Sequence, residues 1–286
     1  MEQSVELRRK SSRMQVKQNR KGEVEYLTFP LLEKTGLVRH LFSTRLGGVS
    51  EDIWSSMNLS YSRGDKKEAV DENYRRIADV LGCEVLDIVC SDQTHTTNVR
   101  MVDRKDCGKG ILTAKDYTDV DGLITNEPGI VLATFYADCV PLFFIDIENK
   151  AIGLSHSGWR GTVGRIGQRT IEAMANAYGT KAEDVIVAIG PSICQECYEV
   201  SGDVAEAFYE EFSKPGQGDS ILYAKGNDKY QLDLWKANQI VLEEAGVKTE
   251  HIQVTDLCTC CNPDYLFSHR ASQGKRGNLG AFLGLL

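Results

Sequence analysis

The chain has 286 residues, 42% of them hydrophobic and 26% charged, which is typical of a globular protein with a substantial core. The formal net charge of −8 argues against nucleic acid as the main partner, because phosphate backbones need a basic face. No apolar run approaches the roughly 18–20 residues that span a bilayer, so a membrane partner is not expected either. The nine cysteines, an odd number, and the lack of an export signal predict a cytoplasmic protein.

The first 22 residues are predicted to form a basic tail and the start of a hairpin. No apolar segment of the kind found in secretory signals follows the basic residues. An arm that seeks RNA or a membrane is one interpretation, but a solvated tail is favoured. Residues 23–286 are therefore expected to form one catalytic domain. The basic residues of the tail are Arg8, Arg9, Lys10, Arg13, Lys17, Arg20 and Lys21.

Strands and helices alternate along the whole length, which predicts one domain of the α/β or α+β class. Neither a repeat nor a Pro/Ser-rich linker interrupts the pattern. Residues 190–198 read as a loop and residues 214–229 as a polar surface excursion. The expected helices are 66–81, 162–178, 202–212 and 234–245. The expected strands are 14–18, 23–29, 38–42, 85–89, 123–125, 130–136, 140–147, 151–154, 184–189, 251–257, 265–268 and 279–286.

A cysteine and a histidine follow apolar strands in the central stretch of the chain. Cys139 separates two apolar runs, and His156 ends a third one, directly before a predicted helix. Such a pair suits a soft metal ion, and it also suits a thiol nucleophile with its base. His95, in a polar segment after an earlier strand, favours the first interpretation. With three protein ligands, zinc keeps a fourth position for water or substrate, as in catalytic sites. Asp138 and Gln93, next to two of these ligands, are candidates for orienting them or handling protons.

Cys194 and Cys197 form a Cys-x-x-Cys pair, which invites a zinc or redox interpretation. No second pair at zinc-finger spacing is expected to accompany it, although Cys258, Cys260 and Cys261 lie far downstream. The pair also lacks the position that a thioredoxin-like motif has before a helix. We therefore interpret these residues as loop cysteines packed inside the protein.

Two segments are candidates for binding an anion. Gly47 and Gly48 permit backbone N–H groups to converge on a phosphate, and Arg45 precedes them. Arg160 lies where the N-terminus of a helix is expected, beside His156. Both arginines also have a purely structural interpretation, as residues that pair with neighbouring strands or with Asp138.

Several motifs occur in a fixed order from about residue 23 to the C-terminus: 42–50 (FSTRLGGVS), 92–95 (DQTH), 118–123 (TDVDGL), 137–141 (ADCVP), 156–161 (HSGWRG), 189–193 (IGPSI) and 267–270 (FSHR). In these motifs the chain resembles the laccase-domain family, also called multicopper polyphenol oxidase-like. The resemblance implies a single α+β domain in which mixed sheets are sandwiched between helices (α-β-β-α layers), similar to the deamidase domain of cytotoxic necrotising factor. One departure lies at residues 268–274 (SHRASQG), where relatives often have an Arg-Arg-Asp run, so the roles of His269 and Arg270 stay open.

The resemblance also implies an activity. Members are described as zinc-dependent purine nucleoside phosphorylases that act on adenosine, inosine, guanosine and methylthioadenosine and also deaminate adenosine. The expected partners are thus a purine nucleoside and phosphate, and the expected form is a monomer or weak homodimer. The implied metal ligands are those predicted above, with Cu²⁺ as a substitute for Zn²⁺. Taken together with the candidates above, the predicted catalytic residues are His95, Cys139, His156 and Asp138, and the predicted substrate- and phosphate-binding residues are Arg45, Asn58, Gln93 and Arg160.

Three alternatives remain at this point. A metal-free cysteine hydrolase or amidase, such as one that edits peptidoglycan precursors, would use Cys139 as nucleophile and His156 as base. A copper-dependent polyphenol oxidase is disfavoured, because five histidines in total cannot supply imidazoles to four coppers. A purely structural zinc would need a fourth protein ligand, for which Cys258 is a candidate.

Overall fold

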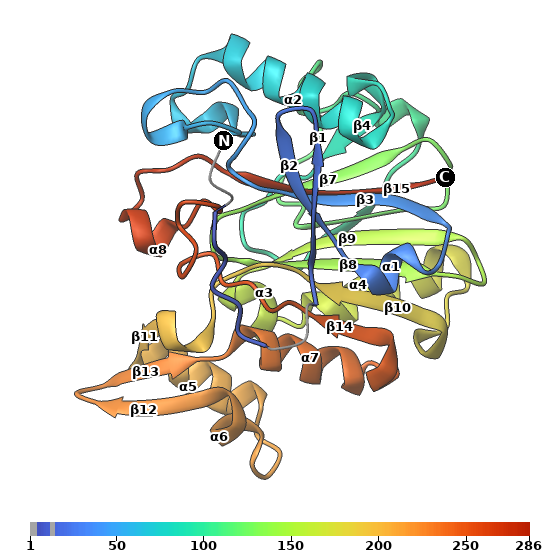
Figure 1. Cartoon of the computed structure of the whole chain (residues 1–286). Helices are drawn as coiled ribbons and strands as arrows, with labels where there is room; N and C mark the ends of the chain where they lie inside the picture. Colours follow the sequence, from blue (N-terminus) through green and yellow to red (C-terminus); the bar gives the residue numbers. More distant parts are fainter. Residues whose placement is uncertain (1–4, 12–14) are drawn as a thin grey trace.

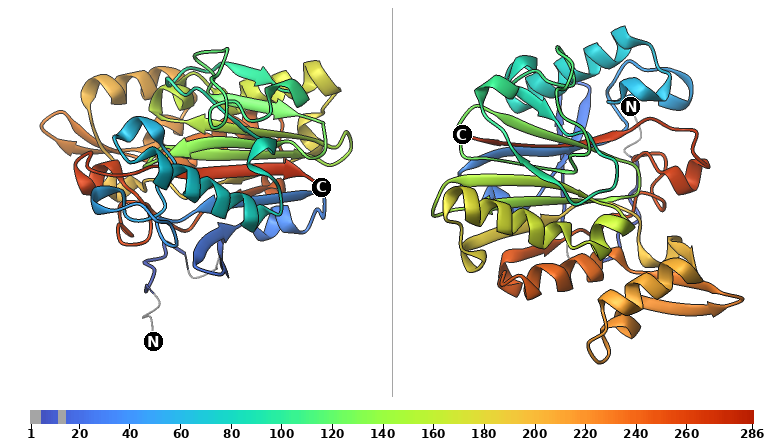
Figure 2. Two further views of the ribbon diagram at one scale, coloured as in Figure 1. Left: turned by 90° about the horizontal axis from the view of Figure 1, so that it is seen from above. Right: turned by 180° about the vertical axis from the view of Figure 1, so that it is seen from behind.

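Two six-stranded sheets lie face to face between two layers of helices in the computed structural model of the chain (Figure 1). The structure describes residues 5–11 and 15–286. Helix α2 (Lys67–Leu81) covers the outer side of the first sheet, and helices α4 (Ile166–Tyr178) and α7 (Leu234–Glu244) cover the second (Figures 1 and 2). The predicted α-β-β-α arrangement is confirmed.

The first sheet joins the two ends of the sequence. The C-terminal strand β15 lies between β3 and β7, antiparallel to both. Only the pairing of β4 with β7 is parallel in this sheet. The strands in spatial order are β1 (Lys17–Lys21), β2 (Val24–Thr28), β3 (Val38–Ser43), β15 (Leu279–Leu285), β7 (Val131–Tyr136) and β4 (Ile88–Cys90).

The second sheet contains the central hairpin of the chain, formed by β8 and β9. Its two outer pairs, β14 with β10 and β5 with β6, are parallel. Within each pair, the segments that follow the two strands therefore start at the same edge of the sheet. The strands in spatial order are β14 (Ile252–Val254), β10 (Val185–Ile189), β8 (Val140–Asp146), β9 (Ala151–Ser157), β6 (Gly122–Thr125) and β5 (Val99–Met101).

A small third sheet projects from one end of the sandwich (Figure 1). It lies partly in residues 214–229, which contain a short helix and a strand where we expected a polar excursion. Its strands are β11 (Glu199–Ser201), β13 (Lys229–Leu232) and β12 (Leu222–Gly226). The remaining helices are α1 (Pro30–Glu33), α3 (Trp159–Val163), α5 (Gly202–Glu211), α6 (Gln217–Ile221) and α8 (His269–Ser272).

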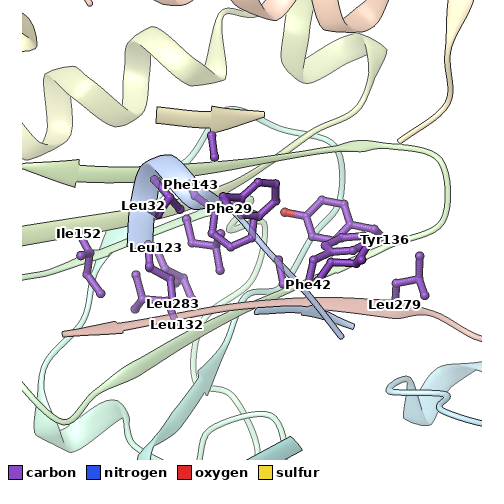
Figure 3. Close-up of a cluster of buried hydrophobic side chains, with 14 of the residues drawn as sticks. Phe29, Leu32, Phe42, Leu123, Leu132, Tyr136, Phe143, Ile152, Leu279 and Leu283 are labelled. Atoms are coloured by element: carbon purple, nitrogen blue, oxygen red, sulfur yellow. The ribbon is translucent and has the colours of Figure 1, made fainter. Parts of the chain in front are cut away.

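The main core lies between the two sheets, where large apolar side chains from both inner faces meet (Figure 3). Phe29 packs against Phe143 of the opposite sheet at a ring-centroid distance of 4.9 Å. Within the first sheet, Phe42 of β3 packs against Tyr136 of β7 at a ring-centroid distance of 5.9 Å. Because strands alternate their side chains, a continuous apolar run such as β8 can serve this core and the helical layer on its other side. This burial holds the strand ends, and therefore the site described below, in fixed positions.

Some predicted elements differ from the structure. Residues 162–178 belong to two helices, because Arg165 adopts a left-handed conformation (φ 60°) between α3 and α4. Its guanidinium is held by Glu211 and Glu244 at 2.9 Å and 2.7 Å. Residues 265–268 form no strand, and a 3₁₀ turn occupies the first half of the expected strand 85–89. The predicted strand 14–18 begins in part outside the described residues, as does Arg13 of the basic tail.

Part of the basic tail contacts the domain. Arg9 forms an ion pair of 2.6 Å with the buried Asp256, and the Lys10 N–H donates to the Asp256 carbonyl at 2.8 Å. The Arg8 N–H donates to Asn262 Oδ1 at 2.7 Å. At residues 8–10 the structure therefore shows a packed segment where a solvated tail was favoured. Among residues 5–11 and 15–286, no helix combines the length and apolarity needed to cross a membrane.

Candidate metal centre

His95, Cys139 and His156 lie together, with their donor atoms within 4.8 Å of one another. Cys139 occupies the turn between β7 and β8, and the β8–β9 hairpin places His156 opposite Pro141. His95 reaches them from the segment after β4 in the other sheet, so that its Nε2 is 3.9 Å from Cys139 Sγ. The structure thus brings together the three residues that the sequence predicts as metal ligands.

Asp121 lies behind this group and holds two of its members, His95 and His156, by hydrogen bonds. Its fully buried carboxylate accepts a hydrogen bond of 2.8 Å from His156 Nδ1, which leaves Nε2 available to a metal ion. The same carboxylate accepts from the N–H groups of Thr94, His95 and Thr96 at 3.1, 3.1 and 2.9 Å. A carboxylate behind a histidine fixes the ring's tautomer and orientation, as it does in many metal sites. The sequence showed Asp121 only as part of a turn.

The electrostatics of the group suit a thiolate ligand. Burial works to raise the pKa of Cys139, but the nearby His156 and His95 outweigh it and lower this pKa to about 6. For His156, burial works to lower the pKa, whereas Cys139 and Asp121 together raise it to about 9. In the metal-free protein near neutral pH, the pair is therefore a thiolate and an imidazolium. A metal ion replaces one proton in this arrangement.

The backbone around the group adopts uncommon conformations. His95 and Asp138 have positive φ angles of 67° and 89°. Residues other than glycine rarely adopt such angles, and those that do cluster at functional sites. Gly158 is required for a different reason. A Cβ atom there would lie 2.8 Å from His95 Cδ2 and 3.3 Å from Cys139 Sγ. The chain therefore approaches the ligands as closely as a residue without a side chain permits.

The three ligands line a cavity of about 510 Å³ that lies at the edge of the sandwich. One part of its wall is aromatic and includes Tyr61, Tyr74 and Phe135. Another part is cationic, with Arg63 and Arg276. The lining also contains the ion pair of Lys115 with Asp92. Its other residues are Leu59, Ser60, Ser62, Cys90, Ser91, Gln93, Gly110, Tyr136, Ala137 and Asn278.

Of the four residues predicted to bind substrate or phosphate, Gln93 lines this cavity. Its amide is engaged with the Phe135 backbone, donating to the carbonyl at 2.7 Å and accepting from the N–H at 2.6 Å. Asn58 is fully buried behind the cavity and accepts from the N–H groups of Ser60 and Asn278 at 3.1 Å and 3.0 Å. Asn58 thus shapes the wall without reaching the interior.

The other two predicted phosphate ligands, Arg45 and Arg160, lie outside the cavity lining. Arg45 donates to the Ser55 and Pro263 carbonyls at 2.9 Å and 2.7 Å and stacks on a phenylalanine ring. Gly47 beside it is needed for packing, since a Cβ there would lie 2.1 Å from the Glu23 carbonyl oxygen. Arg160 is exposed, with its guanidinium over the Trp159 ring. A role for either in phosphate binding stays a prediction.

Asp138, predicted as a catalytic residue, is buried and also absent from the cavity lining. Its two carboxylate oxygens accept from Thr259 Oγ1 at 2.6 Å and from the Arg270 N–H at 2.7 Å. These bonds tie the residue before Cys139 to two segments near the C-terminus. The geometry favours a positioning role, and proton transfer by Asp138 stays a prediction.

The profile of the family described as "Multi-copper polyphenol oxidoreductase laccase" matches residues 39–286. The chain belongs to this family. It is 37% identical over 248 residues to a Bacillus subtilis protein named "Purine nucleoside phosphorylase YlmD", which covers 85% of this chain and 87% of that protein. It is 39% identical over 257 residues to "Purine nucleoside phosphorylase" of Deinococcus radiodurans, covering 90% of this chain and 93% of that protein.

Solved structures of relatives have the same fold. The crystal structure of YlmD from Geobacillus stearothermophilus matches with a TM-score of 0.87 and 32% sequence identity, over 96% of this chain and 99% of that one. A Bacillus licheniformis protein titled "hypothetical protein YfiH" gives the same TM-score at 30% identity, over 94% of this chain and 99% of that chain.

The copper chemistry in the family's description does not fit the histidines of this chain. All five lie within the described residues, and only His95 and His156 belong to a metal-binding group. His40 is buried in the core, where its Nε2 accepts from the Phe29 N–H at 2.9 Å, and burial lowers the pKa of His40 to about 4. A blue copper together with a trinuclear centre would need many more imidazoles in one place.

Sequence reasoning missed the two arginines of the cavity. Arg276 is only 8% exposed, and its buried Nε has no hydrogen-bond partner among the described residues. Burial and the neighbouring Arg63 lower the pKa of Arg276 to about 10. In the described part of the chain neither arginine forms an ion pair with a carboxylate. Two guanidinium groups that line one cavity in this way are a candidate site for a polyanion.

Sequence reasoning also missed a second group of four cysteines. Cys258 does not close the first site, because its sulfur lies with those of Cys194, Cys197 and Cys261. The prediction that no second pair at metal-binding spacing accompanies Cys194 and Cys197 is therefore wrong. Cys258 and Cys261 have the same Cys-x-x-Cys spacing, a signal that was visible in the sequence. Arg270 does not join the first site either, since its guanidinium donates to the Glu199 carbonyl at 2.9 Å.

Proposed function

We propose that this protein is a zinc-dependent purine nucleoside phosphorylase that acts on adenosine, inosine, guanosine and methylthioadenosine. In the reaction a phosphate oxygen attacks C1′ of the ribose, the C1′–N9 bond breaks, and the purine leaves after taking up a proton. One observation carries the proposal. The polyanion site of Arg63 and Arg276 shares its cavity with the His95, Cys139 and His156 group. The names of the relatives agree with it.

The donor set of the metal centre fits zinc, which accepts imidazole nitrogen and thiolate sulfur in a tetrahedral arrangement and leaves a fourth position open. Copper accepts the same donors and can substitute. When bound, the ion supplies a Lewis acid at the floor of the cavity. The chain's own contribution is to keep the ligands in place, with Asp121 behind His156 and Gly158 leaving room for His95.

The phosphate is proposed to lie between Arg63 and Arg276. A dianion there would offset the repulsion between the two guanidinium groups, which together with burial lowers the pKa of Arg276. Ser60 and Ser62, whose hydroxyls are 3.2 Å apart, can add neutral donors from the same loop. As the ribosyl group gains positive charge during departure of the base, the neighbouring phosphate stabilises it.

The purine is proposed to lie against the aromatic part of the wall. Tyr61 and Tyr74 stack on each other with ring centroids 5.8 Å apart, and Phe135 meets Tyr74 edge to face at 6.4 Å. Flat apolar surfaces of this kind bind a purine ring and exclude water from the glycosidic bond. Gln93 fixes the Phe135 backbone and thereby the shape of this wall.

We also propose that the same cavity deaminates adenosine. In that reaction water replaces the amino group at C6 of the purine, and ammonia is released. Deamination consumes no phosphate, so an assay with and without phosphate distinguishes it from phosphorolysis. With adenosine alone, ammonia and inosine are expected; with phosphate added, free purine base is expected as well.

The decisive experiment measures the release of hypoxanthine from inosine by the zinc-loaded protein, with and without phosphate. Phosphate-dependent release together with ribose 1-phosphate supports the proposal, and a panel of adenosine, guanosine and methylthioadenosine ranks the substrates. No release from any of the four nucleosides in the presence of phosphate would overturn it. Ammonia release from adenosine tests the deamination separately, so one activity can fail without the other.

A metal-free cysteine hydrolase is the second candidate, and one observation favours it. Cys139, His156 and Asp121 also form a thiolate–imidazolium–carboxylate array, in which Asp121 orients the base. An enzyme of this kind would be active in the presence of chelator and would be inactivated by iodoacetamide with one label on Cys139. Activity that disappears with the metal and returns with zinc would exclude this candidate.

A further inference from the structure

Two Cys-x-x-Cys pairs from distant parts of the chain meet at one edge of the second sheet. Cys194 and Cys197 follow β10, while Cys258 and Cys261 follow β14. Because β10 and β14 are parallel neighbours, with Ile189 opposite Val254, the chain leaves both strands at the same edge. All four sulfurs lie within 4.8 Å of one another.

The spacing of these sulfurs matches the edges of a small tetrahedron. Cys197 Sγ is 3.5 Å from Cys261 Sγ, and Cys194 Sγ is 3.9 Å from Cys261 Sγ. Four sulfurs at about 2.3 Å from a central zinc ion would be separated by about 3.8 Å. A disulfide would require about 2.05 Å, and none of the four cysteines forms one in the structure.

Backbone N–H groups point at the sulfur of Cys258. The Cys194 N–H donates to it at 3.2 Å and the Cys261 N–H at 3.4 Å. Such hydrogen bonds strengthen when the acceptor is a thiolate, because one partner is then charged. Cys194 and Cys258 are buried, and Cys197 and Cys261 are half-buried. The loops therefore present a sulfur cage that is largely shielded from solvent.

The loops are held together independently of the sulfurs. The Thr259 N–H donates to the Ser192 carbonyl at 3.1 Å, and Trp235 Nε1 donates to Ser192 Oγ at 2.7 Å. Asn262 Nδ2 donates to the Cys258 carbonyl at 2.8 Å. The cage is thus preorganised by its backbone, as a site that selects four-coordinate geometry requires.

A cationic segment lies against the cage. Residues 8–10 pair with residues 256–262, and Lys10 forms an ion pair of 3.3 Å with Glu196, which stands between the first two cysteines. Although partial burial works to lower the pKa of Lys10, the sulfurs of Cys194 and Cys261 raise it. A zinc ion with four thiolates has a net charge of −2, and a nearby ammonium group offsets part of it.

We infer that Cys194, Cys197, Cys258 and Cys261 bind a second zinc ion in a closed, four-sulfur structural site. Two Cys-x-x-Cys pairs are the ligand pattern of structural zinc sites, in which no position remains for substrate. The inference does not depend on the reaction proposed for the cavity.

This second ion would act on the first site through Thr259, which lies between two of the cage cysteines. Thr259 donates to Asp138 at 2.6 Å, and Asp138 directly precedes the ligand Cys139. The cage therefore lies behind the turn that presents Cys139 to the cavity. Loss of the second ion is expected to lower the thermal stability and to loosen this turn.

The test counts metal ions. We expect two zinc ions per chain in the protein purified with zinc, and one in the Cys197→Ser/Cys261→Ser variant, with a lower Tm. The Cys139→Ala variant should also retain one. The X-ray absorption spectrum of the Cys139→Ala protein should show four sulfur neighbours at about 2.3 Å from zinc. The Cys83→Ser variant, altered at a half-buried cysteine at the end of α2, is the matched control and should keep two.

Three results would overturn the inference. One is a Cys197→Ser/Cys261→Ser protein that keeps as much zinc as the control. Another is a wild-type chain with a disulfide among the four cysteines, found by mass spectrometry under native conditions. The third is an absorption spectrum of the Cys139→Ala protein that lacks the four-sulfur shell. The last two measurements use the wild-type and Cys139→Ala proteins. They therefore still test the inference if the Cys197→Ser/Cys261→Ser protein fails to fold.

Discussion

The two cysteine-containing groups of this molecule differ in number of donors, in donor type and in access. The first has three donors, two of them imidazoles, and lines a cavity of about 510 Å³. The second has four sulfurs on two loops, and none of its residues lines that cavity. A metal ion with three protein ligands can bind substrate, whereas four thiolates saturate zinc. We therefore expect the first group to serve the reaction and the second to stabilise the fold.

The first group, His95, Cys139 and His156, leaves a metal position open and is called the open group. Removal of one of its ligands is expected to have the largest effect. Cys139→Ala should abolish phosphorolysis and release the zinc ion of this group, because two histidines alone hold zinc weakly. Steady-state assays with inosine and phosphate, together with metal analysis, check both points. The Cys83→Ala variant serves as the cysteine control with full activity. A Cys139→Ala protein that keeps both its metal content and its activity contradicts the ligand assignment.

The pH should affect the two groups differently, and the open group can be isolated in the Cys197→Ser/Cys261→Ser protein. There the pKa of Cys139 is about 6 and that of His156 about 9, so between these values the free site has one proton to lose. Zinc affinity should therefore rise tenfold per pH unit, on the order of 10³ from pH 6 to pH 9. Below pH 6 the dependence steepens, since the thiolate also becomes protonated.

Competition with a chromophoric chelator at several pH values measures this dependence. Calorimetry in buffers of different ionisation enthalpy should show the release of about one proton per zinc ion at pH 7. Affinity that does not change between pH 6 and pH 9 would mean that His156 is neutral in the free protein. The assignment of Cys139 and His156 as a thiolate–imidazolium pair would then be wrong.

The residue behind the open group offers a milder change. Asp121→Asn keeps the shape of the side chain but removes the negative charge that orients His156. The carboxylate accepts five hydrogen bonds, from His156 Nδ1, from three backbone N–H groups and from Thr96 Oγ1. Loss of such an outer partner typically costs about 10–100-fold in metal affinity. Asp184→Asn, at a half-buried position of the turn before β10, is a control. An Asp121→Asn protein with unchanged zinc affinity would indicate that the backbone of residues 94–96 alone fixes the site.

The sequence predicted that His95, Cys139 and His156 lie together. Cys139 follows β7, His156 lies near the end of β9, and His95 lies in the segment after β4, so the two sheets place all three. The layer order was also predictable, since continuous apolar runs such as 140–147 indicate strands buried on both faces. Asp121 was not recognised, because an aspartate before a glycine is first of all typical of a turn. The four-sulfur group depends on the adjacency of β10 and β14, and single-sequence patterns do not give strand order.

The glycine pair shows a second limit of pattern reading. Gly47 and Gly48 suggested an anion-binding turn, which stays a prediction, and in the structure both glycines are needed where two backbones approach closely. Arg63 and Arg276 line the cavity although no motif connects them, because loops bring them together. A glycine pair can serve either purpose, and only the surrounding packing distinguishes them.

The smallest predicted effect concerns the phosphate alone. Arg63→Met keeps a long apolar side chain on an exposed turn but removes one charge-assisted contact, so the KM for phosphate should rise about tenfold. The KM for inosine and the zinc content should stay the same, because neither ligand contacts this residue in the proposed arrangement. Arg169→Met, at an exposed position of α4, is the arginine control. Arg160→Met tests the competing site, and a larger KM change there than in Arg63→Met would move the phosphate to the N-terminus of α3.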